Sequence, residues 1–155
     1  MNRFPRPSGV SLVFVVFIVL VFTMAMFCHA DTIDIHLHDT MFVLSPVHFA
    51  VVLSLFALPF LLMYWFGKRL FANMPLAWLH AISTTVILLV AAGYVFSYAA
   101  NPGWVQYQPQ ANSWLQEWWP AILALVFLLV QIIFLVNLLT GIIRRIVEHL
   151  KRRSV

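Results

Sequence analysis

The sequence has few charged residues and a single cysteine. Charged residues make up 9% of the 155, against about 25% in an ordinary soluble domain, which excludes that class. Cys28, the lone cysteine, excludes an internal disulfide and a CxxC metal site. The chain also lacks a phosphate-cradling glycine loop, a Ser/His/Asp order and paired carboxylates within its apolar segments, so no catalytic residue is assigned.

Long apolar runs dominate what is present. Hydrophobic residues are 63% of the chain, and four segments are long enough to span roughly 30 Å of hydrocarbon. Because the connections between them are short, neighbouring helices should be antiparallel. The sequence therefore predicts an all-α integral membrane protein, with residues 1–155 forming a single transmembrane bundle of four helices at about 10–28, 41–66, 76–98 and 121–143.

The charges alternate between the two sides of this predicted bundle. All nine Lys and Arg residues lie in residues 1–7, in residues 67–73 or after residue 143. The other two connections, residues 29–40 and the Trp-rich residues 99–120, hold four of the five acidic residues. The positive-inside rule places both termini in the cytoplasm of a bacterial inner membrane. The net charge of +4 then indicates contact with anionic lipid headgroups and not with nucleic acid.

Residues 1–30 also resemble a secretory signal. Arg3 and Arg6 precede an apolar stretch, which ends at a small-residue pattern from Cys28 to Ala30. The apolar core of roughly 18 residues exceeds the usual 7–15 of a cleaved signal, which favours a retained helix. Cleavage would leave three helices and a mature chain that begins at Asp31.

A few polar side chains interrupt the apolar segments. They are expected to mark helix contacts, each worth about 0.6–2 kcal/mol as an interhelical hydrogen bond. Tyr64 is expected among the aromatic residues that lie at the inner membrane boundary. No chemistry is assigned to the polar set, which is Ser83, Thr84, Thr85, Gln131 and Asn137.

Histidine and carboxylate residues concentrate just before the second apolar segment. In an extended chain, Asp34, His36 and His38 would lie on one side, with Asp39 adjacent. Such nitrogen and oxygen donors suit Zn²⁺, Cu²⁺ or Mn²⁺, so Asp34, His36, His38 and Asp39 are candidate metal ligands. The alternative is a solvated polar boundary that holds no metal.

His48 lies inside the second apolar segment. If a helix begins at Met41, His48 is about 10 Å below the outer boundary, where an imidazole needs a hydrogen-bond partner or a metal. His80 should lie near the opposite boundary, so the two cannot bridge one iron, whose axial nitrogens are about 4 Å apart. Other partners for His48 stay open, namely Met24, Met26, His29, a second copy of the chain and another subunit.

Residues 34–53, DIHLHDTMFVLSPVHFAVVL, resemble one stretch of subunit I of the haem–copper (cytochrome c) oxidases. That family has a His-Asp-Thr followed by His-x-His in a transmembrane helix entered from the outer face. The resemblance implies that His48 is a haem axial ligand, at the position of the low-spin ligand. It also implies that His38 and Asp39 match the pair near the haem propionates and a Mg²⁺ or Mn²⁺ site.

The chain departs from that family in three respects. Pro46 occupies the position of the high-spin haem ligand and cannot bind iron. The three-histidine copper site with its cross-linked tyrosine has no counterpart, and the chain is much shorter than the oxidase subunit. It is therefore not expected to be an enzyme on its own or a complete terminal oxidase.

Three functions are compatible with these residues. The first is a small membrane protein that binds one haem or metal near its outer face and acts in electron transfer or beside an oxidase. Its partners would be respiratory-chain subunits or a second copy of itself. The second is a non-haem protein that binds a divalent metal, and the third is an accessory membrane protein without a cofactor.

Overall fold

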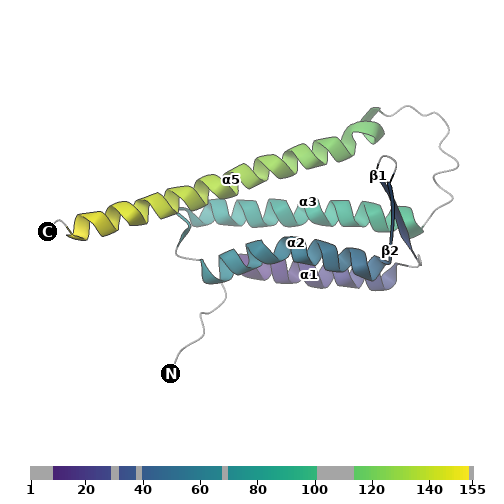
Figure 1. The fold of residues 1–155 in the computed structure, drawn as a ribbon, viewed down its shortest axis with the longest axis horizontal. Coiled ribbons are helices and arrows are strands. Elements are labelled where there is room, and N and C mark those ends of the chain that lie inside the picture. The colour runs from purple at the N-terminus through teal and green to yellow at the C-terminus, as the bar shows by residue number, and fades with distance from the viewer. Residues whose placement is uncertain (1–8, 29–31, 38–39, 68–69, 101–113, 154–155) are drawn as a thin grey trace, which may run out of the picture.

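The computed structural model describes residues 9–28, 32–37, 40–67, 70–100 and 114–153. Four of its helices are long and apolar enough to cross a membrane, which confirms the predicted four-helix membrane bundle (Figure 1). In chain order the elements are α1 (Gly9–Phe27), β1 (Ile33–Leu37), β2 (Thr40–Leu44), α2 (Pro46–Phe66), α3 (Met74–Ala100) and α5 (Trp114–Arg153).

The helices pack as a staggered bundle. Helix α1 contacts both α2 and α3, and α5 packs on α3. The β1–β2 hairpin lies across one end of the bundle, while α1 begins and α5 ends at the other (Figure 1). The cations of α5 are therefore remote from the hairpin, as the charge pattern predicts. Which end faces the cytoplasm stays a prediction.

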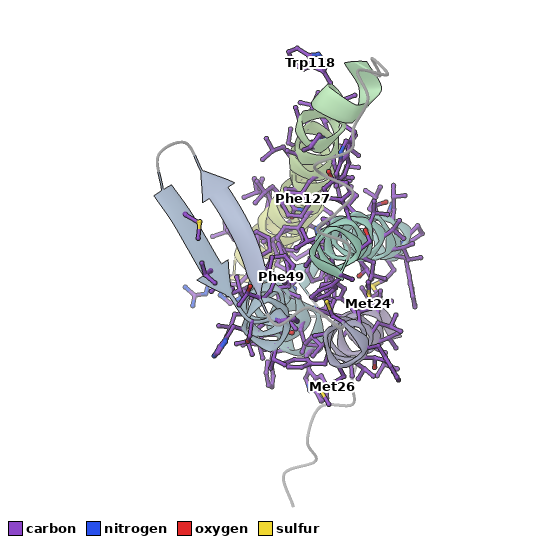
Figure 2. All side chains as sticks on the ribbon, turned by 90° about the vertical axis from the view of Figure 1, so that its right-hand side faces the viewer. Met24, Met26, Phe49, Trp118 and Phe127 are labelled. Atoms are coloured by element: carbon purple, nitrogen blue, oxygen red, sulfur yellow. The ribbon has the colours of Figure 1, made fainter. Side chains whose placement is uncertain are left out.

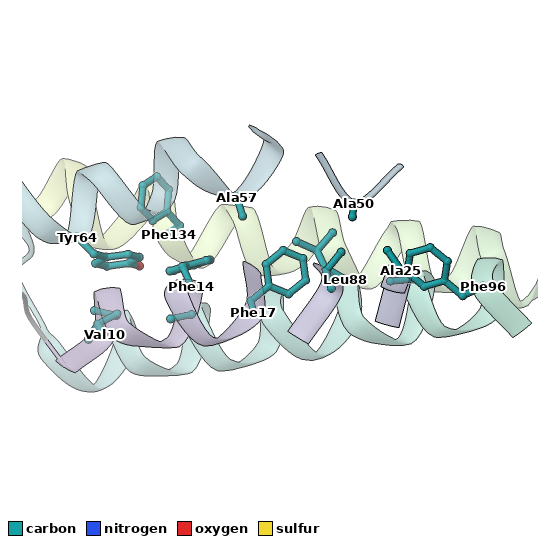
Figure 3. Packing of buried hydrophobic residues seen from close by; sticks show 14 of the residues in the cluster. Val10, Phe14, Phe17, Ala25, Ala50, Ala57, Tyr64, Leu88, Phe96 and Phe134 are labelled. Atoms are coloured by element: carbon teal, nitrogen blue, oxygen red, sulfur yellow. The ribbon is translucent and has the colours of Figure 1, made fainter. Parts of the chain in front are cut away.

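The core follows one stripe of α1. Phe14, Phe17 and Val21 are fully buried along it, at the three- and four-residue spacing of a helix face. The ring of Phe14 stacks on the ring of Tyr64 in α2, with centroids 5.9 Å apart, and Figure 3 shows the two side by side. Small residues such as Ala57 in α2, which is also fully buried, let the helices approach closely.

The second helix begins later than the sequence predicted. Residues 41–44 belong to strand β2, and α2 starts at Pro46. A residue before proline avoids the helical region, and Ser45 is extended, with φ −72° and ψ 154°. Proline also has no N–H to donate to the carbonyl of residue 42. Pro46 is therefore at the first position of the helix, where the missing N–H costs nothing.

The fourth helix is longer than predicted at both ends. Helix α5 includes residues 114–120, which were assigned to the Trp-rich outer loop, and continues past Ile143 to Arg153. Hydropathy marks only the part of a helix that lies in hydrocarbon. The flanking turns are rich in Leu, Glu, Gln and Arg, which form helices well in water, so the helix continues beyond the apolar run.

Helix α5 is hydrogen-bonded to the segment between α2 and α3. The Asn137 side chain accepts a hydrogen bond from Asn73 N (2.8 Å) and donates one to Asn73 O (2.8 Å). One turn later, a Cβ on Gly141 would collide with the backbone of Leu70. Glycine at this position thus allows the chain to cross α5 in direct backbone contact.

We predict that Gly141→Ala lowers the stability of the bundle by about 1–3 kcal/mol, because the new methyl group must push the Leu70 backbone off α5. The measurement is reversible unfolding in detergent. The matched control is Gly93→Ala in α3, where the nearest atom to the new Cβ is Met24 Cε at an ordinary 3.5 Å. A Gly141→Ala variant as stable as Gly93→Ala would contradict the close crossing.

Candidate functional site

His48 is the third residue of α2 and is exposed at the hairpin end of the bundle. Its backbone N–H donates to Ser45 Oγ (3.2 Å), which caps the helix. The same oxygen lies 2.6 Å from the ring Nδ1 of His48. Ser45 therefore positions both the start of the helix and the imidazole. Because the helix begins at Pro46, His48 lies in its first turn and not the predicted 10 Å below the boundary.

This arrangement leaves one ring nitrogen for a ligand. Within the described part of the chain, no hydrogen bond to His48 Nε2 is recorded. A metal-bound histidine typically has its other ring nitrogen held by a neighbouring polar group, which fixes the tautomer and the ring orientation. The Ser45 hydroxyl occupies that position here. The geometry suits a single imidazole ligand presented from a helix end.

An apolar surface continues from His48 along α2. Val51 and Val52 are three and four residues on, and are therefore neighbours of His48 on the helix surface. They are 39% and 53% exposed, and Leu55 is 61% exposed one turn further. This strip faces away from the bundle, so a lipid chain, a flat apolar ligand or another protein can contact it.

Two of the predicted metal ligands, Asp34 and His36, lie in strand β1 of a hairpin that the sequence did not predict. Ile33–Leu37 is extended, as the alternation argument requires, and Asp34 and His36 pair in register with Val43 and Met41. The side chains of Asp34 and His36 lie outside what the structure describes. His38 and Asp39 are outside the described residues altogether. The ligand roles of these four residues stay predictions.

A strand lies between the start of α2 and the residues that precede it in the oxidase-like segment. Leu37 pairs with Thr40, and these residues flank His38 and Asp39. Thr40 to Leu44 is one strand, about 13 Å long at the usual rise, and α2 begins only after it. The hairpin extends away from α2 (Figure 2). Thr40, the first described residue after His38 and Asp39, is therefore separated from His48 by the whole of strand β2 and the start of α2.

Other proposed partners of His48 are arranged differently. Met24 packs against α3, where its Cε faces Gly93, and Figure 2 shows it on the α3 side of α1. Met26 is 75% exposed, and His29 lies outside the described residues. Among the residues that the structure describes, no three His, Cys, Asp or Glu side chains come together.

His80 forms a second site, which is buried and fully hydrogen-bonded. Its Nδ1 lies 2.9 Å from Tyr64 Oη, and its Nε2 lies 3.1 Å from Gln131 Oε1 and 3.2 Å from Thr84 Oγ1. Gln131 in turn donates to Thr84 Oγ1 at 3.4 Å. These four residues, the His80 cluster, join α2, α3 and α5.

The donors and acceptors of the His80 cluster define one tautomer. Gln131 Oε1 can only accept, so the ring proton is on Nε2, and the Tyr64 hydroxyl donates to Nδ1. Both nitrogens are thus engaged, and His80 has none left for iron. The expected interhelical hydrogen bonds of Thr84 and Gln131 are confirmed.

The prediction that Tyr64 lies in a boundary belt is wrong, because this side chain is only 2% exposed. A signal for its burial was present in the sequence. Tyr64 follows Ala50 and Ala57 at seven-residue intervals, and residues so spaced share one helix face. All three are buried. The hydrogen bond from Tyr64 to His80 had no sequence signal.

No family model, no curated protein and no solved structure matches this chain. What the protein does has therefore to be inferred from His48, the hairpin and the His80 cluster themselves. The resemblance of residues 34–53 to the oxidase subunit stays a prediction.

We predict that Tyr64→Phe and Gln131→Leu each destabilise the bundle by about 0.6–2 kcal/mol, since each leaves a buried polar atom of the cluster without its partner. Because both partners act on the His80 ring, the double variant should deviate from additivity by at least about 0.5 kcal/mol. Unfolding in detergent measures both effects.

The control pairs Tyr64→Phe with Thr140→Val. Thr140 is also on α5, but its hydroxyl bonds only to Val136 O in the same helix (2.7 Å) and is exposed. This pair should be additive. Additive energies for Tyr64→Phe with Gln131→Leu would show that the cluster does not act as a unit.

Proposed function

We propose that this integral membrane protein binds one haem through His48 at the hairpin end of its bundle and takes part in membrane electron transfer beside an oxidase or another respiratory subunit. The observation that carries the proposal is the contact of Ser45 Oγ with His48 Nδ1 at 2.6 Å on an exposed imidazole. The second support for the proposal is the resemblance of residues 34–53 to the oxidase sequence.

The residues present fit one side of a haem. A neutral imidazole nitrogen is a common axial ligand of haem iron, and a bound haem would supply a one-electron redox couple. Ser45 would hold the His48 ring in place, and the exposed side chains of Val51 and Val52 would offer apolar contact to the macrocycle. The chain's own part is thus to bind and orient the group.

Two residues of this chain are not available as a second ligand of the haem. His80 has both ring nitrogens hydrogen-bonded within the core, and Met24 is packed against α3. The second ligand would then come from Met26, His29, a second copy of the chain or a neighbouring subunit on the exposed strip of α2. Pro46, at the position of the high-spin haem ligand in the oxidase resemblance, is buried and its side chain has no donor atom. An oxygen-reducing centre is accordingly not proposed.

A second candidate function is the binding of a divalent metal by the hairpin. The extended backbone of β1 supports it, because Asp34 and His36 are two residues apart in one strand, as the ligand prediction requires. His38 and Asp39 would contribute further donors. In this alternative, His48 has no part in the site.

We predict that protein purified after expression with ample haem shows a Soret band and a reduced α-band, and that His48→Ala abolishes both. Ser45→Ala should retain the ligand but weaken haem binding by about 10- to 100-fold, as is usual when the group that orients a metal-bound histidine is removed. A reduced-minus-oxidised spectrum with a pyridine haemochrome assay measures each.

The control variant is His149→Ala, which removes an exposed histidine near the end of α5 and should leave the spectrum unchanged. Wild-type protein without haem would refute the haem proposal. Measurement of the metal content of the protein then tests the second candidate function, a divalent-metal site in the hairpin. A divalent ion that survives His48→Ala but is lost on combining Asp34→Asn with His36→Ala would place the site in the hairpin. Protein free of both haem and metal would favour an accessory role without a cofactor.

A further inference from the structure

A cavity lies where the connection between α2 and α3 meets α5, at the end of the bundle remote from the hairpin. It is partly open and has a volume of about 280 Å³. This is close to the lower limit of small-ligand pockets, about 300 Å³, and suits a headgroup-sized ligand. The lining residues are Phe71, Ala72, Gly141, Arg144, Arg145 and Glu148.

One wall of this cavity is α5 and the other is the connection between α2 and α3, and hydrogen bonds join the two. Asn137, one turn before Gly141, binds both backbone groups of Asn73 at 2.8 Å, and Ala72 N donates to Asn137 O at 3.3 Å. Asn137 is only 2% exposed. The wall formed by Phe71, Ala72 and Gly141 is therefore fixed by the junction, and the exposed side chains of α5 complete the lining.

The charges of the cavity favour an anion. Two guanidinium groups and one carboxylate line it, and Arg144 Nε bonds to Glu148 Oε1 at 3.1 Å. No ion pair of Arg145 is recorded among the described residues. A guanidinium group presents a planar set of donors that matches the oxygens of a phosphate, often with two parallel hydrogen bonds.

The cavity lies where the apolar run of α5 ends, which is the level expected for lipid headgroups. The apolar run of α5 ends at Ile143, and the two arginines follow directly. Further along the same helix, Lys151, Arg152 and Arg153 are all exposed. Basic pockets between helices at a membrane boundary bind anionic headgroups. A phosphate that enters from the lipid layer would reach Arg145 before it met the tail cations.

We propose that this cavity binds a phosphate group, carried by a phospholipid headgroup or free in solution, with Arg145 as its main ligand. Arg144 is the second ligand and is partly occupied by Glu148. This site is independent of the proposed haem site, which lies at the other end of the bundle.

The test uses the full chain in a neutral detergent and native mass spectrometry. Phosphatidylglycerol, diacylglycerol (which has no phosphate) and inorganic phosphate are titrated separately. Arg145→Gln should weaken phosphatidylglycerol binding by about 10- to 100-fold, the effect of losing a charge-assisted hydrogen-bond pair. Glu148→Gln should strengthen it, since Arg144 is released. Arg153→Gln, the control outside the cavity, should change it by about twofold or less.

The separate titrations with lipid and with inorganic phosphate distinguish the two sources of the phosphate group. Phosphatidylglycerol binding that millimolar inorganic phosphate does not displace identifies a lipid headgroup. Inorganic phosphate that binds alone and is lost in Arg145→Gln identifies the free anion. Equal losses for Arg145→Gln and Arg153→Gln, or diacylglycerol bound as tightly as phosphatidylglycerol, would overturn the proposal.

Discussion

The hydrogen bonding of one imidazole buried in the core of the bundle governs how three of the four helices meet. Hydrocarbon offers no hydrogen bonds, so each polar group there must find a partner within the protein. His80 is fully buried and finds Tyr64 on α2 and Gln131 on α5, with Thr84 one turn along its own helix. A rotation of α2 or α5 would break one of these bonds, and this cost would add to the loss of van der Waals packing between the helices.

Aromatic rings enclose this polar centre. Phe60, Phe134 and Tyr64 have ring centroids within 6 Å of the His80 ring, and Phe14 of α1 stacks on Tyr64. The aromatic side chains around the cluster therefore come from α1, α2 and α5, and they pack against His80 of α3. Helix α1 covers the rings of Tyr64 and His80 through Phe14, and so completes the core.

Helix α5 has two polar anchors with different partners. Gln131 reaches the His80 cluster, whereas Asn137 holds the connection between α2 and α3. Six residues separate them, so they lie on different sides of the helix. The first anchor sets the helix against the bundle core, and the second sets it against the Asn73 backbone and shapes the phosphate-sized cavity. The two ends of the bundle thus differ in chemistry, with an exposed histidine at one and arginines at the other.

The sequence alone was enough to predict four membrane helices, because an apolar run of about 20 residues matches the thickness of the hydrocarbon layer when it is helical. It also marked Gln131 and Thr84 as helix contacts. It misplaced the start of the second helix, although Pro46 carried the signal, since hydropathy does not distinguish an apolar strand from a helix. Tertiary structure alone decided that Tyr64 and Gln131 meet at His80 and that Gly141 meets Leu70. Each of these depends on how helices rotate and cross, which joins residues far apart in the chain and leaves no local pattern.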